Sequence, residues 1–226
     1  MKIVIINASA RKNGATARIL NEFFNNLSAR GDVEIENVHL SDLRLGFCLG
    51  CCLYYKNGIC HIEDDAETLS ELISDSDGVV IGTPTYVSGV SGQLKTFIDR
   101  GHFVTEQLLK GKYTVGVATY ENADGGSALK ALKKLFICSG AKRFDRLIIK
   151  LPFNTNPIEN TRVKAMIKSK SDSLYVSIAK EKPAGIIYAA VNYFVFNFGL
   201  KPFVLRKGDQ YAGVKKHWEK RNIAYE

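Results

Sequence analysis

The sequence has no apolar run long enough to cross a bilayer. Its most apolar stretch, residues 183–205, is interrupted by Asn192 and Asn197. Lys201 and Pro202 end the apolar part after about 18 residues, whereas a membrane-spanning helix needs about 20. We therefore expect no membrane span and interpret the stretch as a buried or inter-subunit helix.

The pattern of a secretory signal is also missing. The opening residues, MKIVIINAS, do not combine a basic segment, an apolar segment and a small-residue cleavage site. They run directly into a strand-like pattern. We expect a cytoplasmic protein, and in that compartment clustered cysteines bind metal or undergo redox reactions more often than they form structural disulfides.

Several common enzyme motifs are absent as well. The first apolar segment is followed neither by GxGxxG nor by a loop ending in GK[ST]. No nucleophile elbow or Ser/His/Asp order supports a hydrolase. The histidines are scattered along the chain, and we expect them to be structural or exposed rather than catalytic; they are His39, His61, His102 and His217.

Positive charge is concentrated in the C-terminal part of the chain. The net charge is +8, and residues 141–226 hold 17 Lys or Arg against 7 Asp or Glu. Such a segment can attract nucleic acid, an anionic membrane surface or phosphorylated small molecules, or it can be a solvated basic face. We expect no nucleic-acid partner.

Strand-like and helix-like segments alternate along the first two thirds of the chain. Short segments with the pattern of strands occupy residues 2–9, 33–40, 77–84, 112–119 and 146–153. Helical patterns separate them, which predicts βαβ units and a doubly wound, five-stranded parallel sheet. We predict an α/β domain over residues 1–155. A helical C-terminal extension over residues 156–226 would pack on this domain or on a partner subunit.

The loop SARKNGAT, residues 9–16, would lie at the carboxyl end of the first strand. Open parallel sheets bind their ligands at this edge. The loop offers backbone N–H groups at a helix N-terminus, the hydroxyls of Ser9 and Thr16, and the guanidinium of Arg11. These groups are suited to a phosphate, although a polar turn without a ligand can have the same composition.

Two further loops would lie at the same edge. TPTYVSGVSG, residues 83–92, is stiffened by Pro84 and presents Tyr86 as a flat aromatic surface. TYENADGG, residues 119–126, places two glycines where a backbone can pass close to a ligand. A phosphate loop followed by two such loops favours a phosphorylated ligand with a planar ring.

Three segments, NASARKNGAT, GTPTYVSGVSGQLKTFIDR and CLGC…NGICHIEDD, resemble the NAD(P)H-dependent FMN reductase family and its iron–sulfur flavoprotein relatives. The resemblance runs in order over residues 2–150. It implies a flavodoxin-like fold, FMN as cofactor and NAD(P)H as co-substrate, with no indispensable catalytic side chain because the flavin carries the chemistry. Ala15 departs from the family, where asparagine is common.

The resemblance also implies which residues hold FMN. The phosphate would lie against Ser9, Arg11, Asn13, Gly14, Ala15 and Thr16. The ring would lie against Pro84, Thr85, Tyr86, Val87 and Ser88, and its other side against Thr119, Tyr120, Glu121, Gly125 and Gly126.

Four of the five cysteines lie within the segment CLGCCLYYKNGIC. The iron–sulfur relatives that the chain resembles carry Cys-x2-Cys-x2-Cys-x4–7-Cys. Cys48, Cys51 and Cys60 match this spacing, but Tyr54 stands at the third position. Cys52 can replace it only if a local kink turns two adjacent side chains to one side.

We therefore favour thiols without a metal in this segment. A [4Fe–4S] cluster on Cys48, Cys51, Cys52 and Cys60 stays open, as do a zinc site and a redox disulfide.

Together these features favour an FMN-dependent oxidoreductase that takes hydride from NAD(P)H and passes electrons to a second acceptor. The acceptor can be a quinone, a nitro or azo compound, free flavin, a metal complex or a protein. Two alternatives remain. One is an iron–sulfur flavoprotein that receives electrons from ferredoxin, and the other is a passive flavodoxin-type carrier.

Residues 186–204 are apolar almost all round a helix, so one face of a sheet cannot cover them. Exposed on a monomer, they would form a larger patch than soluble proteins usually tolerate. We predict a homodimer or a larger even homo-oligomer, with this segment at the interface and close to the flavin of the partner. The alternative is a helix folded back onto its own domain.

Overall fold

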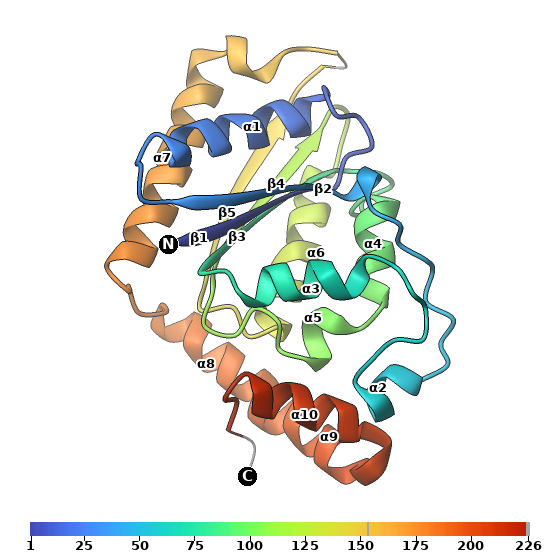
Figure 1. The fold of residues 1–226 in the computed structure, drawn as a ribbon. Coiled ribbons are helices and arrows are strands. Elements are labelled where there is room, and N and C mark those ends of the chain that lie inside the picture. Colours follow the sequence, from blue (N-terminus) through green and yellow to red (C-terminus); the bar gives the residue numbers. More distant parts are fainter. Residues whose placement is uncertain (153, 225–226) are drawn as a thin grey trace.

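The computed structural model describes residues 1–152 and 154–224 and shows a central sheet between two layers of helices (Figure 1). Its strands are β1 (Lys2–Asn7), β2 (Glu34–His39), β3 (Gly78–Pro84), β4 (Tyr113–Tyr120) and β5 (Arg143–Lys150). They pair in the order β2-β1-β3-β4-β5, and every neighbouring pair is parallel. The predicted flavodoxin-like, doubly wound sheet is thus confirmed.

Strands β1 and β5 differ from the prediction by more than one residue. β1 ends at Asn7 rather than at residue 9, because the Asn7 side chain accepts a hydrogen bond from the backbone N–H of Ser9 (3.0 Å) and turns the chain. β5 begins at Arg143, ahead of the predicted start at residue 146. As an edge strand it has polar first residues and exposes alternate side chains. Residue 153, the predicted end of this strand, lies outside the described residues.

Helices cover both faces of the sheet (Figure 1). One face carries α1 (Ala15–Ser28) and α7 (Thr161–Ala179), and the other carries α3 (Ala66–Ser74), α4 (Gly92–Asp99), α5 (His102–Thr105) and α6 (Gly125–Cys138). Side chains of β1 alternate between the two cores. Ile3 and Ile5 join the core with α1 and α7, whereas Val4 and Ile6 join the opposite core. Because both faces are buried, this strand is apolar throughout.

Helix α7 belongs to the part of the chain that we predicted as the C-terminal extension. It follows the short helix η2 (Pro157–Glu159), and its N-cap Asn160 accepts hydrogen bonds from the backbone N–H groups of Arg162 (3.0 Å) and Val163 (3.2 Å). Its apolar residues, including Ile167, join the core beneath α1. Residue 155 therefore remains only a predicted boundary, since the helix after it packs on the sheet.

The rest of the extension forms a group of helices beside α2, at the bottom of Figure 1. They are α8 (Ile186–Phe194), the π-helical turn η3 (Val195–Leu200), α9 (Lys201–Arg206), η4 (Gly208–Tyr211) and α10 (Ala212–Lys220). They enclose a small core that contains Phe196, Val204, Val214, Trp218 and Ile223. Within the described ranges, no helix combines the length and the apolar character that a membrane span requires.

The connection from β2 to α3 is long and carries four cysteines. It contains η1 (Leu40–Asp42) and α2 (Leu53–Asn57). Arg100 and Asp64 form a buried ion pair, and both also bond the backbone of Gly46: Arg100 donates to its carbonyl (3.0 Å) and Asp64 accepts from its N–H (2.7 Å). Removing either partner would leave a buried charge, at a cost of about 3–5 kcal/mol. The segment just before the cysteines and the segment just after them are therefore held together.

Candidate functional site

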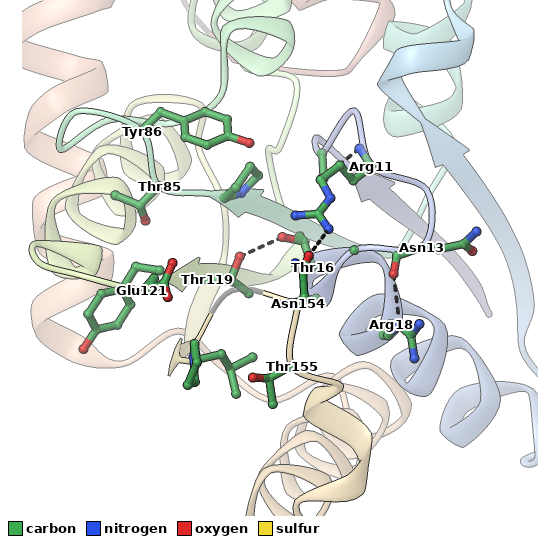
Figure 2. Close-up of a pocket in the computed structure, with 17 residues that line it drawn as sticks. Arg11, Asn13, Thr16, Arg18, Thr85, Tyr86, Thr119, Glu121, Asn154 and Thr155 are labelled. Atoms are coloured by element: carbon green, nitrogen blue, oxygen red, sulfur yellow. Dashed lines mark hydrogen bonds between the residues drawn. The ribbon is translucent and has the colours of Figure 1, made fainter.

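A cavity of about 340 Å³ lies where the strand order changes, at the carboxyl ends of β1, β3 and β4 (Figure 2). Most of the residues predicted for the phosphate and the ring line it: Ser9, Arg11, Asn13, Gly14, Ala15, Thr16, Pro84, Thr85, Tyr86, Thr119, Tyr120 and Glu121. Val87, Ser88, Gly125 and Gly126 are not on its wall. The three predicted loops thus converge on one pocket.

The loop after β1 is folded by a short chain of hydrogen bonds. Ser9 Oγ accepts from the backbone N–H of Arg11 (3.2 Å), and the Arg11 carbonyl accepts from the N–H of Gly14 (3.0 Å). Gly14 is the N-cap of α1 and offers no side chain to its first turn. The first N–H groups of α1 therefore face the pocket without a capping side chain, as an anion requires.

Two guanidinium groups add positive charge to this end of the pocket. Arg11 donates to Asn154 Oδ1 (2.7 Å), and Arg18 donates through Nε to the carbonyl of Asn13 (2.9 Å) (Figure 2). The hydroxyls of Thr16 and Thr119 lie 2.7 Å apart and join the first loop to the third. Fixed hydroxyls and cations at a helix N-terminus favour a phosphate.

The loop after β3 makes a tight two-residue turn. Tyr86 and Gly89 exchange two backbone hydrogen bonds (3.1 and 2.9 Å), and Val87 and Ser88 between them have φ of 45° and 60°. The turn directs Val87 fully into solvent. This is why the predicted contacts of Val87 and Ser88 with the ligand are not found on the pocket wall, while Tyr86 remains there.

The loop after β4 uses its glycines differently from the prediction. Gly125 begins α6, and a Cβ on it would lie 2.2 Å from Cδ1 of Tyr120. Because glycine has no Cβ, Tyr120 can pack against α6 and line the pocket. A Cβ on Gly126 would meet nothing within 4 Å. Neither glycine is on the pocket wall.

Hydrogen bonds to Asp124 join the second and third loops. The hydroxyls of Ser127 and then Ser88 hold the pKa of the Asp124 carboxyl below its usual value. Ser88 therefore supports the wall of the pocket without being part of it.

A buried polar atom indicates where a ligand would bond. Thr85 Oγ1 is buried, has no hydrogen-bond partner and belongs to a residue of the pocket wall. A phosphate-binding end, an aromatic and proline wall and an unpaired hydroxyl together fit FMN, which combines a phosphate with a polar-edged ring.

Five wall residues were not predicted from the sequence. Arg18 lies one turn into α1, and the others follow β5; they are Leu151, Pro152, Asn154 and Thr155. The parallel sheet itself was the available signal, since the loop after β5 must emerge at the same edge as the other three.

A second cavity, of about 70 Å³, lies in the cysteine connection. All four clustered cysteines line it, together with Tyr54, Tyr55 and Arg100. Cys52 has a left-handed backbone (φ 60°) at the start of α2, which supplies the kink that the sequence argument required. The thiols are free, and Cys51 Sγ lies 3.4 Å from Nδ1 of His61.

The sequence leaves zinc and a [4Fe–4S] cluster open for these cysteines, and the two make different demands on the ligands. Within residues 1–152 and 154–224, no three His, Cys, Asp or Glu side chains converge as a site for a single metal ion. A [4Fe–4S] cluster has a different requirement, because each of its four thiolates binds a different iron around an inorganic core. Four thiols on the wall of one cavity meet that requirement in kind and number.

Comparisons with known proteins identify the family. Residues 1–149 match the family described as NADPH-dependent FMN reductase, and the chain belongs to it. Over 225 residues it is 36% identical to an iron–sulfur flavoprotein of Clostridioides difficile (strain 630), covering 99% of this chain and 100% of the relative. It is 38% identical over 124 residues to an iron–sulfur flavoprotein of Archaeoglobus fulgidus, covering 53% of this chain and 54% of the relative.

Solved structures agree on the fold. An apo NADH:FMN oxidoreductase superposes with a TM-score of 0.60 at 20% identity, over 78% of this chain and 89% of the other. A flavone reductase gives 0.65 at 18% identity, over 82% and 65%. The predicted FMN-dependent, flavodoxin-like oxidoreductase is thereby confirmed at the level of family, cofactor and fold.

Proposed function

We propose that this protein is a cytoplasmic FMN-dependent oxidoreductase that takes hydride from NAD(P)H and delivers electrons to a second acceptor, either a small molecule or a protein. The observation that carries the proposal is the cavity at the strand ends, which joins a cationic helix N-terminus to an aromatic wall. FMN, when bound there, supplies the hydride and electron-transfer chemistry.

The protein binds the phosphate at one end of this cavity. N–H groups at the start of α1 donate to it, the Arg11 guanidinium adds a charge-assisted contact, and Thr16 contributes a hydroxyl. Ala15 contributes only its backbone.

The other end of the cavity orients the ring. Pro84 and Tyr86 provide flat surfaces, and the unpaired hydroxyl of Thr85 can bond a polar edge. Residues 119–121 close the opposite side. The described residues of the pocket wall include no His, Cys or Lys, whose side chains could hold or release a proton near neutral pH. We therefore assign the protein's role to binding and orientation.

The visible spectrum of the purified protein tests this proposal. Oxidised protein is mixed anaerobically with NADPH and, separately, with NADH. Bleaching of the flavin bands by either nucleotide is the expected result. Flavin bands that neither nucleotide bleaches would contradict NAD(P)H turnover and favour a passive carrier. Colourless protein that cannot be reconstituted with FMN would overturn the cofactor assignment of the cavity.

A second candidate function follows from the cysteine cavity and from the full-length relative named as an iron–sulfur flavoprotein. In this alternative, electrons enter from ferredoxin through a cluster and reach FMN. A broad visible shoulder beneath the flavin bands, reduced by ferredoxin and not by NADPH, would distinguish it.

We also propose that the protein assembles as a homodimer or larger even homo-oligomer through α8 and η3. Several large apolar side chains of this segment are exposed, with Ile186 at 90%, Ile187 at 82% and Phe198 at 69%. The Phe194 and Phe198 rings stack on each other at 5.2 Å on this surface. Since no described part of the chain covers these side chains, a second copy is the cover that the apolar character of the surface favours.

A further inference from the structure

The loop after β5 meets the phosphate-binding loop at the FMN cavity. Asn154 Oδ1 accepts a hydrogen bond from Nη2 of Arg11 at 2.7 Å (Figure 2). The two residues are 143 positions apart in the chain, and both line the cavity. Asn154 lies beyond residues 1–149, the part of the chain that matches the family. The family match therefore does not account for this contact.

The backbone around Asn154 is held by neighbouring hydrogen bonds. The N–H of Leu151 donates to the Tyr120 carbonyl (2.9 Å), and the N–H of Thr155 donates to the Pro152 carbonyl (3.2 Å). Asn154 itself has a left-handed backbone (φ 62°). Among residues that carry a Cβ, asparagine is one of the few that adopt such a backbone readily. The held backbone fixes where the amide of position 154 begins, and its bond fixes where its oxygen lies.

The acceptor on Asn154 is neutral, which distinguishes its bond from those made to several other guanidinium groups. Three guanidinium groups outside the FMN cavity bond carboxylates; the pairs are Arg30–Asp172, Arg100–Asp64 and Arg221–Glu106. A carboxylate orients a guanidinium but also neutralises its charge, whereas an amide oxygen only orients it. The bond to Asn154 therefore positions Arg11 without reducing its attraction for an anion.

Arg18, the second guanidinium of the cavity wall, is held in the same manner. Its Nε donates to the carbonyl of Asn13 (2.9 Å), which is again a neutral acceptor. A phosphate monoester carries a charge of about −1.5 to −2 at pH 7. Two cations that are held by neutral oxygens at the start of α1 favour a ligand that ends in such a phosphate.

We propose that Asn154 is a positioning residue that makes the cavity select FMN over riboflavin, the same flavin without its phosphate. Asn154 holds the Arg11 side chain in place before the ligand arrives, so less side-chain entropy is lost when the phosphate binds. The inference rests on the proposed binding of FMN in this cavity. It adds a residue outside the phosphate-binding loop that recognises the phosphate through Arg11.

Asn154→Gly tests this role, because glycine keeps the left-handed backbone and removes the amide. Asn222→Gly is the matched control, since Asn222 also has a left-handed backbone (φ 51°) but is not on the cavity wall. Fluorescence titration of flavin-free protein gives the Kd for FMN and for riboflavin. We expect Asn154→Gly to raise the Kd for FMN about tenfold, as a weakened charge-assisted contact implies, and to leave the Kd for riboflavin unchanged. Asn222→Gly should change neither value.

Asn154→Asp separates orientation from charge. A carboxylate at this position would still orient Arg11 but would neutralise its charge and repel the phosphate. We expect FMN to bind Asn154→Asp more weakly than Asn154→Gly, with riboflavin binding again unchanged. FMN that binds Asn154→Asp as tightly as the wild type would contradict the need for a neutral acceptor.

A double-mutant cycle shows whether Asn154 acts through Arg11. In an Arg11→Ala background, Asn154→Gly should have little further effect on the Kd for FMN, because the group that it positions is already gone. Additive effects, an unchanged Kd for FMN in Asn154→Gly, or an equal loss of riboflavin binding would overturn the positioning role alone. Wild-type protein that binds neither flavin would overturn the FMN assignment of the cavity and this inference with it.

Discussion

Two neighbouring glycines at the start of α6 have different surroundings. A Cβ on Gly125 would enter the ring of Tyr120, whereas a Cβ on Gly126 would meet open space. We expect Gly125→Ala to cost about 1–3 kcal/mol of unfolding free energy through overpacking and to weaken FMN binding by displacing a wall residue. Gly126→Ala is the control and should be neutral or stabilising by up to about 1 kcal/mol. Urea unfolding and FMN titration measure both effects, and equal stabilities of the two variants would contradict this account of Gly125.

Arg11 carries the second residue-scale prediction. If its guanidinium bonds the phosphate, Arg11→Ala removes a charge-assisted contact of about 1.5–3 kcal/mol, and the Kd for FMN should rise at least about tenfold. Arg30→Ala is the control, because Arg30 pairs with Asp172 at the surface and is absent from the pocket wall. A fluorescence titration with unchanged Kd in Arg11→Ala would show that the phosphate lies elsewhere.

At the scale of elements, Glu106 makes the packing of α2, α5 and α10 dependent on pH. This buried carboxylate, at the end of α5, accepts hydrogen bonds from Nδ1 of His102 (2.7 Å), from the Tyr54 hydroxyl and from the Arg221 guanidinium. Burial alone would raise its pKa, but the bond from His102 and the charge of Arg221 lower the pKa from the ordinary value of 4.5 to about 2. The associated stabilisation is therefore complete above pH 4.5 and is lost as the pH falls toward 2. The shift corresponds to roughly 3 kcal/mol at neutral pH.

Glu106→Gln should therefore lower the free energy of unfolding at pH 7, and its difference from the wild type should shrink between pH 4.5 and 2. Glu34→Gln is the control, since Glu34 is a surface carboxylate at a long distance (3.8 Å) from Lys2. Urea unfolding at several pH values measures this. A difference that does not change over that range would contradict the charged state of Glu106.

The elements whose pattern is local could be predicted from the sequence. Buried central strands such as β1 and β3 are continuous apolar runs because helices cover both of their faces. The loop that precedes α1 was predictable as an anion site, since it combines a strand end, a helix start and a guanidinium. Edge strand β5 was only partly predictable because its exposed face makes its first residues polar.

Features that depend on tertiary contacts could not be predicted. The left-handed backbone of Cys52 has no local signal, because non-glycine residues adopt it only where the surroundings impose it. The meeting of Tyr54, Glu106 and Arg221 joins residues far apart in the chain. The sequence also gives no sign that Tyr120 fills the space beside Gly125, which we predicted to contact the ligand.

At the scale of the whole molecule, the exposed apolar surface of α8 and η3 leads to a test of assembly. Phe194→Asp combined with Phe198→Asp places two charges on this surface and should convert a dimer into monomers, as measured by light scattering. Phe47→Asp is the control, since Phe47 is even more exposed (79%) but lies in the connection after β2. A monomeric wild type would contradict the proposed assembly. A double variant that remains dimeric would show that the interface lies on another surface.

The FMN pocket draws its walls from four loops that are spread over residues 9–155. A chain that emerges from the ribosome therefore exposes the phosphate-binding loop early but lacks the last wall until β5 and the loop after it have been made. Synthesis proceeds at about 5–20 residues per second, so the nascent chain spends several seconds with half a pocket. We therefore expect the complete FMN pocket to form only after residue 155 has been synthesised and has left the ribosome.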